Sequence, residues 1–463
     1  MNSGDTAWVL ISAALVLLMT PGLAFFYGGM TRSKGVLNMM MMSFGAIGVV
    51  GVLWVLFGYS AAFGTDIGGG LLGNPLEKLG LQGVLDTGSG APLVGSIPEI
   101  VFVGFQAAFA IITVALITGS IADRAKFGAW MVFAAVWVSL VYFPVAHWVF
   151  SFTKDANGNN TGGWLGQGLG VIDFAGGTAV HINAGAAALA LALVLGKRKG
   201  FGKDPSHRPH NLPFVMLGAG LLWFGWFGFN AGSALGANAV AGYAWINTLA
   251  APAAAILGWL LVERLRDGHA TSLGAASGAV AGLVAITPAC SALTPMWSMG
   301  LGLLAGLVCA LAVGLKYRFG IDDSLDVVGV HLVGGIIGTV FIGLAANPSS
   351  PAAGQGLFYG GGFELLGKQA IGAGAVMVYS FIVAYAIAWI INKTMGFRIS
   401  SEHEAIGIDV AIHAESAYDL GGRSSGSFQP HMEKLPKASG NKAAASSEPA
   451  TAQEPINEER VDA

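Results

Sequence analysis

The stretch DFAGGTAVHINAGAAALALALVLG (173–196) begins with an aspartate, places a histidine shortly after it, and then continues without any charged residue. An apolar run of this length predicts a helix that spans a membrane. A second stretch, DVVGVHLVGGIIG (326–338), has the same order of aspartate, histidine and small residues. The two stretches predict a membrane protein that carries a histidine inside each of two spans.

Working outward from these stretches gives eleven apolar runs that are long enough to cross a bilayer. Their approximate cores are residues 7–30, 37–63, 99–121, 127–150, 174–195, 212–232, 239–262, 271–289, 296–315, 327–346 and 367–391. The predicted fold class is an all-α integral membrane protein with eleven transmembrane helices. His181 and His331 each fall in the last span of a group of five, which suggests a five-plus-five inverted repeat with an extra C-terminal helix.

The composition excludes an ordinary soluble enzyme. Only 11% of the residues are charged, against about 25% in a typical soluble domain, and 70 of the 463 residues are glycine. So few charges cannot cover a water-facing surface of this size, whereas glycines let membrane helices approach closely. The sequence has no basic patch with interleaved aromatic residues that would indicate a nucleic-acid partner. Cys290 and Cys309 do not suggest a metal site or a disulfide framework.

The basic residues alternate between the loops. Of the 23 Lys and Arg residues, fifteen lie in one alternate set of loops and three, Lys78, Lys154 and Lys368, lie in the other. Because cytoplasmic loops are enriched in Lys and Arg, we expect the N-terminus outside and the C-terminus in the cytoplasm. The first span has no basic segment before it, so we expect a retained helix rather than a signal peptide.

His181 and His331 are polar groups at membrane depth, where polar groups are costly and therefore informative. Two neutral imidazoles from different spans can hydrogen-bond each other and offer donors and acceptors to a small polar molecule. This interpretation favours a pore. Two alternatives remain: each histidine is satisfied separately by a neighbouring helix, or the two bind a haem, although the sequence lacks the paired histidines of multi-haem membrane cytochromes.

The acidic and aromatic residues near the spans have two possible roles. Asp173 and Asp326 stand at the starts of their spans, where each is expected to cap a helix, and the charge of Asp173 would also favour a nearby cation. Aromatic rings gather in FVGFQAAFA (102–110) and LLWFGWFGFNAGS (221–233). Most such rings face lipid or neighbouring helices, but a ring beside an aqueous funnel can bind a small cation or act as a gate.

Seven segments in order carry a resemblance to one known family. They are PGLAFFYGG (21–29), FQAAFAIITVALITGSIADR (105–124), DFAGGTAVHINAG (173–185), FGWFGFNAGSA (224–234), GAASGAVAGLVAITPAC (274–290), DVVGVHLVGGIIG (326–338) and SEHEAIGIDVAIHAESAY (401–418). Over about residues 7–420 the chain resembles the ammonium transporter (Amt) family, within the wider Amt/Mep/Rh superfamily. The resemblance implies a homotrimer in which each subunit has its own pore.

The resemblance also implies roles for individual residues. Phe109 and Phe229 match a stacked phenylalanine gate, and His181 and His331 match the twin-histidine pair of the pore. Substrate recruitment is expected at Phe109, Phe150, Ser233, Asp173 and Trp226, and the pore wall at Phe26, Gln106 and Thr287. Phe150 is a departure, because bacterial members commonly carry Trp there, and Phe has a weaker π face and no indole N–H.

The expected function is ammonium transport, with no catalytic residues, no metal and no cofactor. NH₄⁺ would be recruited at an outer vestibule and deprotonated, and NH₃ would pass through the twin-histidine pore into the cytoplasm, with a separate route for the proton left open. A neutral ammonia or CO₂ channel of the Rh type and an ammonium sensor (transceptor) remain as alternatives. Transport rather than enzymatic activity is expected, in the cell (plasma) membrane.

The chain is expected to have three parts. Residues 1–396 form the membrane domain, 397–420 a cytoplasmic regulatory segment, and 421–463 a polar tail that composition predicts to be disordered. The resemblance assigns a regulatory role to the second part, with a PII-type signalling protein as partner at the cytoplasmic face. The regulatory residues implied are Arg398, Glu402, Gly407, Asp409 and Tyr418.

Overall fold

Helices make up nearly all the regular structure, as the long apolar runs require. The computed structural model describes residues 1–86, 90–154, 157–203 and 208–418, so the predicted disordered tail 421–463 lies outside the described residues. The helices are α1 (Ser3–Met30), α2 (Val36–Leu53), α3 (Tyr59–Phe63), α4 (Glu99–Ile117), α5 (Phe127–Trp137), α6 (Phe143–Phe150), α7 (Asn183–Leu195), α8 (Leu212–Gly232), α9 (Ala239–Asp267), α10 (Ser272–Ile286), α11 (Pro295–Ala312), α12 (Leu315–Phe319), α13 (Val333–Ala345), α14 (Glu364–Thr394) and α15 (Ser401–Ile406). Two short strands, β1 (Leu93–Val94) and β2 (Ile97–Pro98), pair antiparallel in an outer loop.

The predicted helical membrane architecture is confirmed, but the predicted count of eleven spans is not. Within the described residues, ten helical stretches are long and apolar enough to cross a bilayer, and two of them, Val36–Phe63 and Phe127–Phe150, join two α-helices through a short π-helical segment. The eighth predicted span, 271–289, contains α10, which has only 15 residues. At 1.5 Å per residue this helix is about 22 Å long, which is shorter than a hydrocarbon core of about 30 Å.

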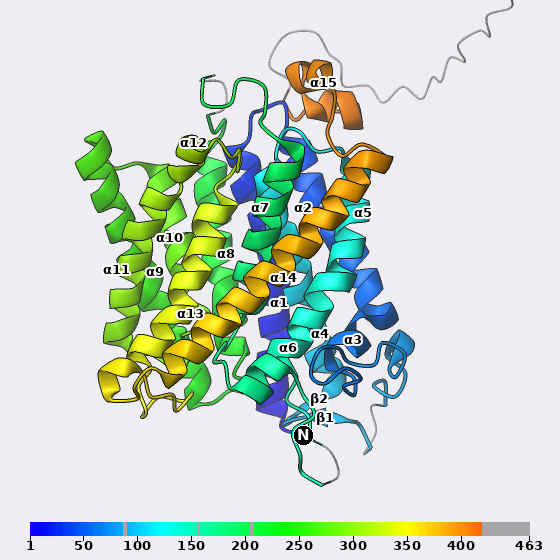
Figure 1. Ribbon diagram of the computed structural model, residues 1–463, viewed down its shortest axis with the longest axis vertical. Coiled ribbons are helices and arrows are strands. Elements are labelled where there is room, and N and C mark those ends of the chain that lie inside the picture. The colour runs from blue at the N-terminus through cyan, green and yellow to red at the C-terminus, as the bar shows by residue number, and fades with distance from the viewer. Residues whose placement is uncertain (87–89, 155–156, 204–207, 419–463) are drawn as a thin grey trace, which may run out of the picture. The chain divides into compact units, whose positions relative to one another are not determined.

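The loops that carry most of the basic residues meet at one end of the helices. Arg32 pairs with Asp123 at 3.2 Å, and Arg198 lies 3.6 Å from the same carboxylate. Arg198 also pairs with Asp322 at 2.9 Å, which joins four loops that are far apart in sequence. Figure 1 shows α12 and α15 at this end and β1, β2 and the N-terminus at the other. The alternation of basic loops therefore corresponds to a real spatial separation, while the side of the membrane that each end faces stays a prediction.

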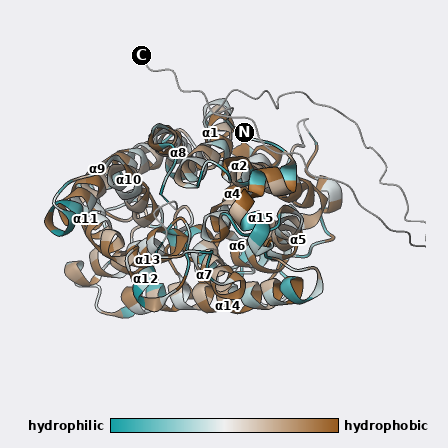
Figure 2. Ribbon diagram, turned by 90° about the horizontal axis from the view of Figure 1, so that it is seen from above, coloured by the Kyte–Doolittle hydropathy of each residue, from teal (hydrophilic) through white to brown (hydrophobic). Residues whose placement is uncertain are grey.

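Much of the outer surface is apolar, as a protein surrounded by lipid requires. On α14 the side chains of Val378, Ile382, Trp389 and Ile390 are each at least half exposed. Figure 2, which looks down on the end that carries α15, shows hydrophobic residues along the outside of α14 as well as between the helices. Only part of this helix is buried, against α7 and α13, so its other face is free for lipid or for a second subunit.

Spans five and ten cross at the positions of the two histidines. His181 lies in a π-helical turn, Gly177–Ile182, that leads into α7, and His331 lies in the equivalent turn, Val328–Leu332, that leads into α13. A Cβ added to Gly185 would lie 2.5 Å from the backbone nitrogen of Leu332, so only glycine allows this approach. Gly335 packs reciprocally against Ile182. The pairing of early with late residues makes the two segments antiparallel, as an inverted repeat requires.

Candidate functional site

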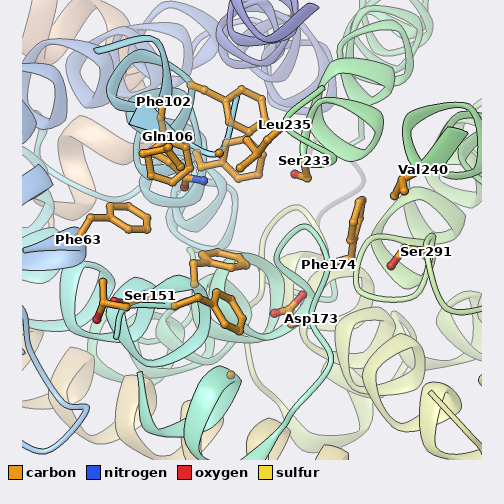
Figure 3. A pocket seen from close by; sticks show the side chains of 18 of the residues that line it. Phe63, Phe102, Gln106, Ser151, Asp173, Phe174, Ser233, Leu235, Val240 and Ser291 are labelled. Atoms are coloured by element: carbon orange, nitrogen blue, oxygen red, sulfur yellow. The ribbon is translucent and has the colours of Figure 1, made fainter. Parts of the chain in front are cut away.

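A cavity of about 880 Å³, which we call the outer cavity after the predicted orientation, opens at the end that carries β1 and β2. Its walls include five of the residues predicted for recruitment or for the pore, namely Gln106, Phe109, Phe150, Asp173 and Ser233. Figure 3 shows Gln106 on one side of this cavity and Ser233, Phe174 and Asp173 on the other. The fold thus brings together residues that are more than 100 positions apart in the sequence. They come from α4, α6, the end of α8 and the segment before α7.

Ser233 presents a hydrogen-bond acceptor to the outer cavity. Its hydroxyl donates to the backbone carbonyl of Phe229, one helical turn earlier, at 2.8 Å. With its proton used in this bond, the Oγ atom keeps lone pairs that can accept a hydrogen bond from a donor in the cavity. The local geometry of the C-terminal end of α8 therefore suits a molecule that carries N–H groups.

Asp173 caps the segment that carries His181, as the sequence predicts. Its carboxylate accepts the backbone N–H groups of Gly176, Gly177 and Thr178 at 2.7 to 2.8 Å, that of Ala179 at 3.2 Å, and the Thr178 hydroxyl. Five donors use most of the lone pairs of a carboxylate. The carboxylate at the wall of the cavity is therefore held in place by donors of its own segment.

Two stacked rings close the bottom of the outer cavity. The Phe109 and Phe229 ring centroids are 4.1 Å apart, with the planes inclined by 27°, and both side chains are buried. Phe109 lines the outer cavity, whereas Phe229 lines a second, narrow cavity beyond it. The stacked pair therefore separates the two cavities, which is the arrangement predicted for a gate.

The inner cavity is a narrow apolar lumen of about 10 Å³, close to the space of one water molecule. It contains the predicted residues Phe26, His181, Phe229 and His331. The Nδ1 atoms of His181 and His331 are 3.2 Å apart, so one ring donates to the other and the pair shares a single proton at this contact. The rings are inclined by only 22° to each other.

His181 keeps an unused polar atom in this apolar lumen. Its buried Nε2 atom has no hydrogen-bond partner among the described residues. A buried polar atom without a partner costs free energy unless something binds to it. The second ring nitrogen of His181 is thus available to a small polar molecule that enters the lumen.

Three residues lie elsewhere than the sequence predicts. Trp226, predicted with the recruitment residues, lines the inner lumen, because it precedes Phe229 by three positions, about 4.5 Å along α8. Its indole N–H donates to the Thr287 hydroxyl at 2.7 Å, and Thr287 lines neither cavity. Thr287 therefore supports the pore wall from behind, and Gln106, predicted for the pore, lies in the outer cavity.

The helix cap predicted at Asp326 is made by a different aspartate. Asp323, rather than Asp326, accepts the backbone N–H groups of Val327 and Val328, at 3.1 and 2.7 Å. Asp326 has a left-handed backbone with a φ of 64° and pairs with Lys316 at 2.7 Å. The spacing to the histidine identifies the right residue, since Asp323 precedes His331 by as many positions as Asp173 precedes His181.

The outer cavity contains an ion pair that the sequence analysis missed. Lys78 pairs with Glu99, and Tyr59 donates its hydroxyl to the same carboxylate at 2.6 Å. Glu99 is also the first residue of α4. A lysine in a loop and a glutamate 21 positions later give no local sequence signal for this contact.

The C-terminal segment 397–418 is attached to the basic loops through several of the predicted residues. Asp409 accepts the backbone N–H groups of Leu37 and Asn38, at 2.9 and 2.7 Å, and so caps α2, whose own N-cap residue is a glycine. Burial raises the pKa of Asp409, although these hydrogen bonds oppose the shift. Tyr418 hydrogen-bonds His210 at 2.9 Å.

The other predicted regulatory residues of this segment are Arg398, Glu402 and Gly407. Arg398 binds the Leu195 carbonyl and pairs with Glu404 at 2.8 Å. Glu402, the predicted regulatory acid, is exposed, and among the described residues the ion pair is made by Glu404 instead. Gly407 has a φ of 122°, and a Cβ there would lie 2.7 Å from the side chain of Lys34.

The described part of the chain has no group of three or more His, Cys, Asp or Glu side chains that could hold a metal ion. Both cysteines are free and buried.

Comparison with known proteins agrees with this geometry. The model of the Ammonium Transporter Family matches residues 7–418. An ammonium transporter of Mycobacterium tuberculosis (strain ATCC 25618 / H37Rv) is 59% identical over 449 residues, which cover 93% of each chain. An ammonium transporter of Bacillus subtilis (strain 168) is 48% identical over 423 residues, covering 90% of this chain and 99% of that one.

Solved structures show the same relationship. The crystal structure of Candida albicans Mep2 has a TM-score of 0.77 at 34% identity, covering 87% of this chain and 88% of that one. A structure described as a sensor Amt protein has a TM-score of 0.79 at 29% identity, covering 88% of this chain and 98% of that one. The stacked phenylalanines, the histidine pair and the match over nearly the whole described chain lead to one conclusion: the chain belongs to the ammonium transporter family and is a multi-pass membrane protein.

Proposed function

We propose that this ammonium transporter recruits NH₄⁺ in the outer cavity, removes a proton near the gate, and conducts NH₃ through the lumen. The observation that carries this proposal is the contact between His181 and His331 in a lumen that is otherwise apolar. The stacked rings above it and the acceptor on Ser233 supply the preceding steps.

The outer cavity suits the charged form of the substrate. Ser233 offers an acceptor, and Phe109 and Phe150 offer the faces of aromatic rings, which attract cations. The fixed charge of Asp173 adds a favourable field without a direct contact. Together these groups would concentrate NH₄⁺ while leaving it partly hydrated, since the cavity is wide.

The lumen suits the neutral form. Moving a bare monovalent ion from water into a medium of low dielectric constant costs of order 20 kcal/mol before any relaxation. Loss of a proton removes most of this cost for ammonium. Potassium has a similar size and the same charge but has no proton to lose, so the lumen would exclude it.

The histidine pair would then guide NH₃. The Nε2 atom of His181, which has no partner among the described residues, can donate or accept a hydrogen bond according to the tautomer of the ring. NH₃ has both N–H donors and a lone pair, so it can bind in either case. Because the pair is neutral, it would not trap a molecule by charge. A separate transfer of the released proton through the imidazoles would make transport electrogenic.

Proteoliposome experiments test this proposal. We expect ammonium to evoke a charge movement on a supported membrane, and we expect the double variant His181→Ala, His331→Ala to lose ammonium transport or its selectivity over potassium. His269→Ala, which changes an exposed histidine in a loop, is the control. Transport by the double variant that is unchanged and still excludes potassium would disprove the role of the pair.

Two other functions are distinguished by the same experiments. A neutral gas channel of the Rh type would equilibrate NH₃ or CO₂ without any charge movement. A sensor would bind ammonium with little flux, and the structural likeness to a protein described as a sensor Amt protein makes this test worthwhile. The ion-attracting groups of the outer cavity favour transport of the cation.

Membership of the ammonium transporter family also supports a proposal for the assembly and regulation of this protein. We propose a homotrimer in the cell membrane, with the N-terminus outside and the basic loops and C-terminal segment in the cytoplasm. The contacts of Arg398, Asp409 and Tyr418 with the loops support a regulatory role for residues 397–418. A PII-type protein is the proposed partner at this face, and pull-down with and without ADP or 2-oxoglutarate tests it.

A further inference from the structure

A second large cavity, which we call the basic cavity, lies at the end opposite the outer cavity. It measures about 660 Å³ and is lined by Arg32 and Lys34 from the loop after α1, Lys199, Arg208 and His210 from the segment between α7 and α8, and Glu404 from α15. Four of these six side chains are permanent cations at neutral pH and one is an anion. The transport pathway described above uses none of them.

The acidic groups near the basic cavity are already engaged. Glu404 pairs with Arg398 at 2.8 Å and accepts the backbone N–H of Lys199. Asp123 pairs with Arg32 and lies near Arg198. Of the described carboxylates, these two therefore neutralise arginines that hold the loops together rather than the lysines of the cavity.

Three cations of the basic cavity remain without a partner. Among the described residues, no carboxylate or carbonyl lies within hydrogen-bond or ion-pair distance of the side-chain nitrogens of Lys34, Lys199 or Arg208. By contrast, the buried Arg124 and Arg198 at the same end each have Asp322 within 4 Å. Like charges around one cavity repel each other, and an anion between them would relieve that repulsion.

We propose that the basic cavity binds a phosphoryl group, as a free phosphate compound or as the headgroup of an anionic phospholipid. Arginine matches phosphate oxygens with its planar fork, and lysine contributes a compact charge. The volume exceeds what a single small ion needs, so it admits a phosphoryl group together with the part of the ligand that carries it. Basic pockets on the cytoplasmic side of membrane proteins bind lipid headgroups by the same chemistry.

The bound group would contact three parts of the chain at once. The loop after α1, the segment before α8 and α15 each contribute to the wall. Arg32 already links the first of these to α15, because it donates to the Glu404 carbonyl at 3.3 Å. A ligand in the basic cavity would therefore fasten the C-terminal segment to the loops, and this site is separate from the transport pathway.

Binding measurements on the full chain test the proposal without any transport assay. The protein is placed in nanodiscs of phosphatidylcholine and titrated with inorganic pyrophosphate in a calorimeter. We expect saturable binding that weakens with salt. Lys199→Gln and Arg208→Gln should each raise Kd about tenfold, since a hydrogen bond to a charged group is worth about that factor or more.

Lys203→Gln is the matched control, because Lys203 is an exposed lysine of the same segment that does not line the basic cavity. A second arm distinguishes the two sources of the phosphoryl group: nanodiscs that also contain phosphatidylglycerol are examined by native mass spectrometry. Lipid that stays bound, is lost in Lys199→Gln and competes with pyrophosphate identifies a lipid headgroup, whereas binding of pyrophosphate alone identifies a soluble compound.

Two results would overturn the proposal. One is the absence of both saturable pyrophosphate binding and retention of phosphatidylglycerol that depends on Lys199. The other is an equal loss of binding in Lys203→Gln, which would mean that the ligand responds only to the diffuse positive charge of this face.

Discussion

Gly185→Ala should separate the two histidines by adding a single methyl group. The new Cβ would lie 2.5 Å from the backbone nitrogen of Leu332, whereas ordinary contacts begin at 3.4 Å. The atoms that the new Cβ would meet belong to the backbone and the Cβ of Leu332, not to the flexible end of a side chain. The two backbone segments therefore have to move apart by roughly 0.9 Å in a closely packed interior. The Nδ1 atoms of His181 and His331 are 3.2 Å apart in the structure. If most of the displacement reaches the two rings, these atoms would lie beyond hydrogen-bond distance.

We expect this variant to lose most of its ammonium transport and about 1–3 kcal/mol of stability, the usual cost of overpacking. Gly335→Ala should have a milder effect, because the nearest atoms to its Cβ, in Ile182 and Gly177, would lie 3.0 to 3.2 Å away rather than 2.5 Å. Gly374→Ala is the control, since a Cβ there meets nothing within 4 Å. Uptake in proteoliposomes and thermal unfolding of the purified protein measure both effects.

Normal uptake by Gly185→Ala, with unchanged unfolding, would refute this reasoning, because it would mean that the histidine contact does not depend on the close approach of spans five and ten. A loss as large in Gly374→Ala would point instead to a general intolerance of larger residues.

Three further variants test other parts of the molecule. Ser233→Ala removes the acceptor of the outer cavity and should raise the KM for ammonium about tenfold with little change in maximal rate; an unchanged KM would remove this residue from recruitment. Lys78→Gln leaves Glu99 without its ion-pair partner, so KM should fall severalfold at low ionic strength and recover in salt, and a salt-independent KM would contradict this. Asp409→Ala removes the cap of α2 and should lower the free energy of unfolding by about 1 kcal/mol. We expect a protease to cleave the C-terminal segment faster in this variant. A cleavage rate equal to that of the unsubstituted protein would contradict the prediction.

The sequence predicts the helices, the alternation of the loops and most of the site because each depends on local signals. Apolar length identifies a span, and a histidine inside a span stands out against its neighbours. The short α10 was predicted as a full span because the apolar residues continue to Leu293, while the helix ends at Ile286 and the rest forms tight turns. Hydropathy measures the apolar run and does not register where the helix stops.

The site predictions that differ from the structure have a common cause. The position of a side chain along the pore axis, and its partner in an ion pair, depend on the fold rather than on local sequence. Trp226 and Ser233 belong to one motif, yet seven positions along α8 place them on opposite sides of the gate. Lys78 meets Glu99 only because the outer loop folds back over α4. Glu404 rather than Glu402 faces Arg398 because it lies on the buried side of a short helix.

The small volume of the lumen has a consequence for the energy supply of the cell. A proton crosses water by hopping along a continuous file of molecules, and a cavity with room for about one molecule holds no such file. A proton that crosses this part of the lumen would therefore use the imidazoles of His181 and His331, by exchange of tautomers. If the lumen conducts NH₃ as proposed, its narrowness limits the leak of protons that a continuous file of water would allow, and it confines any proton movement to the histidine pair.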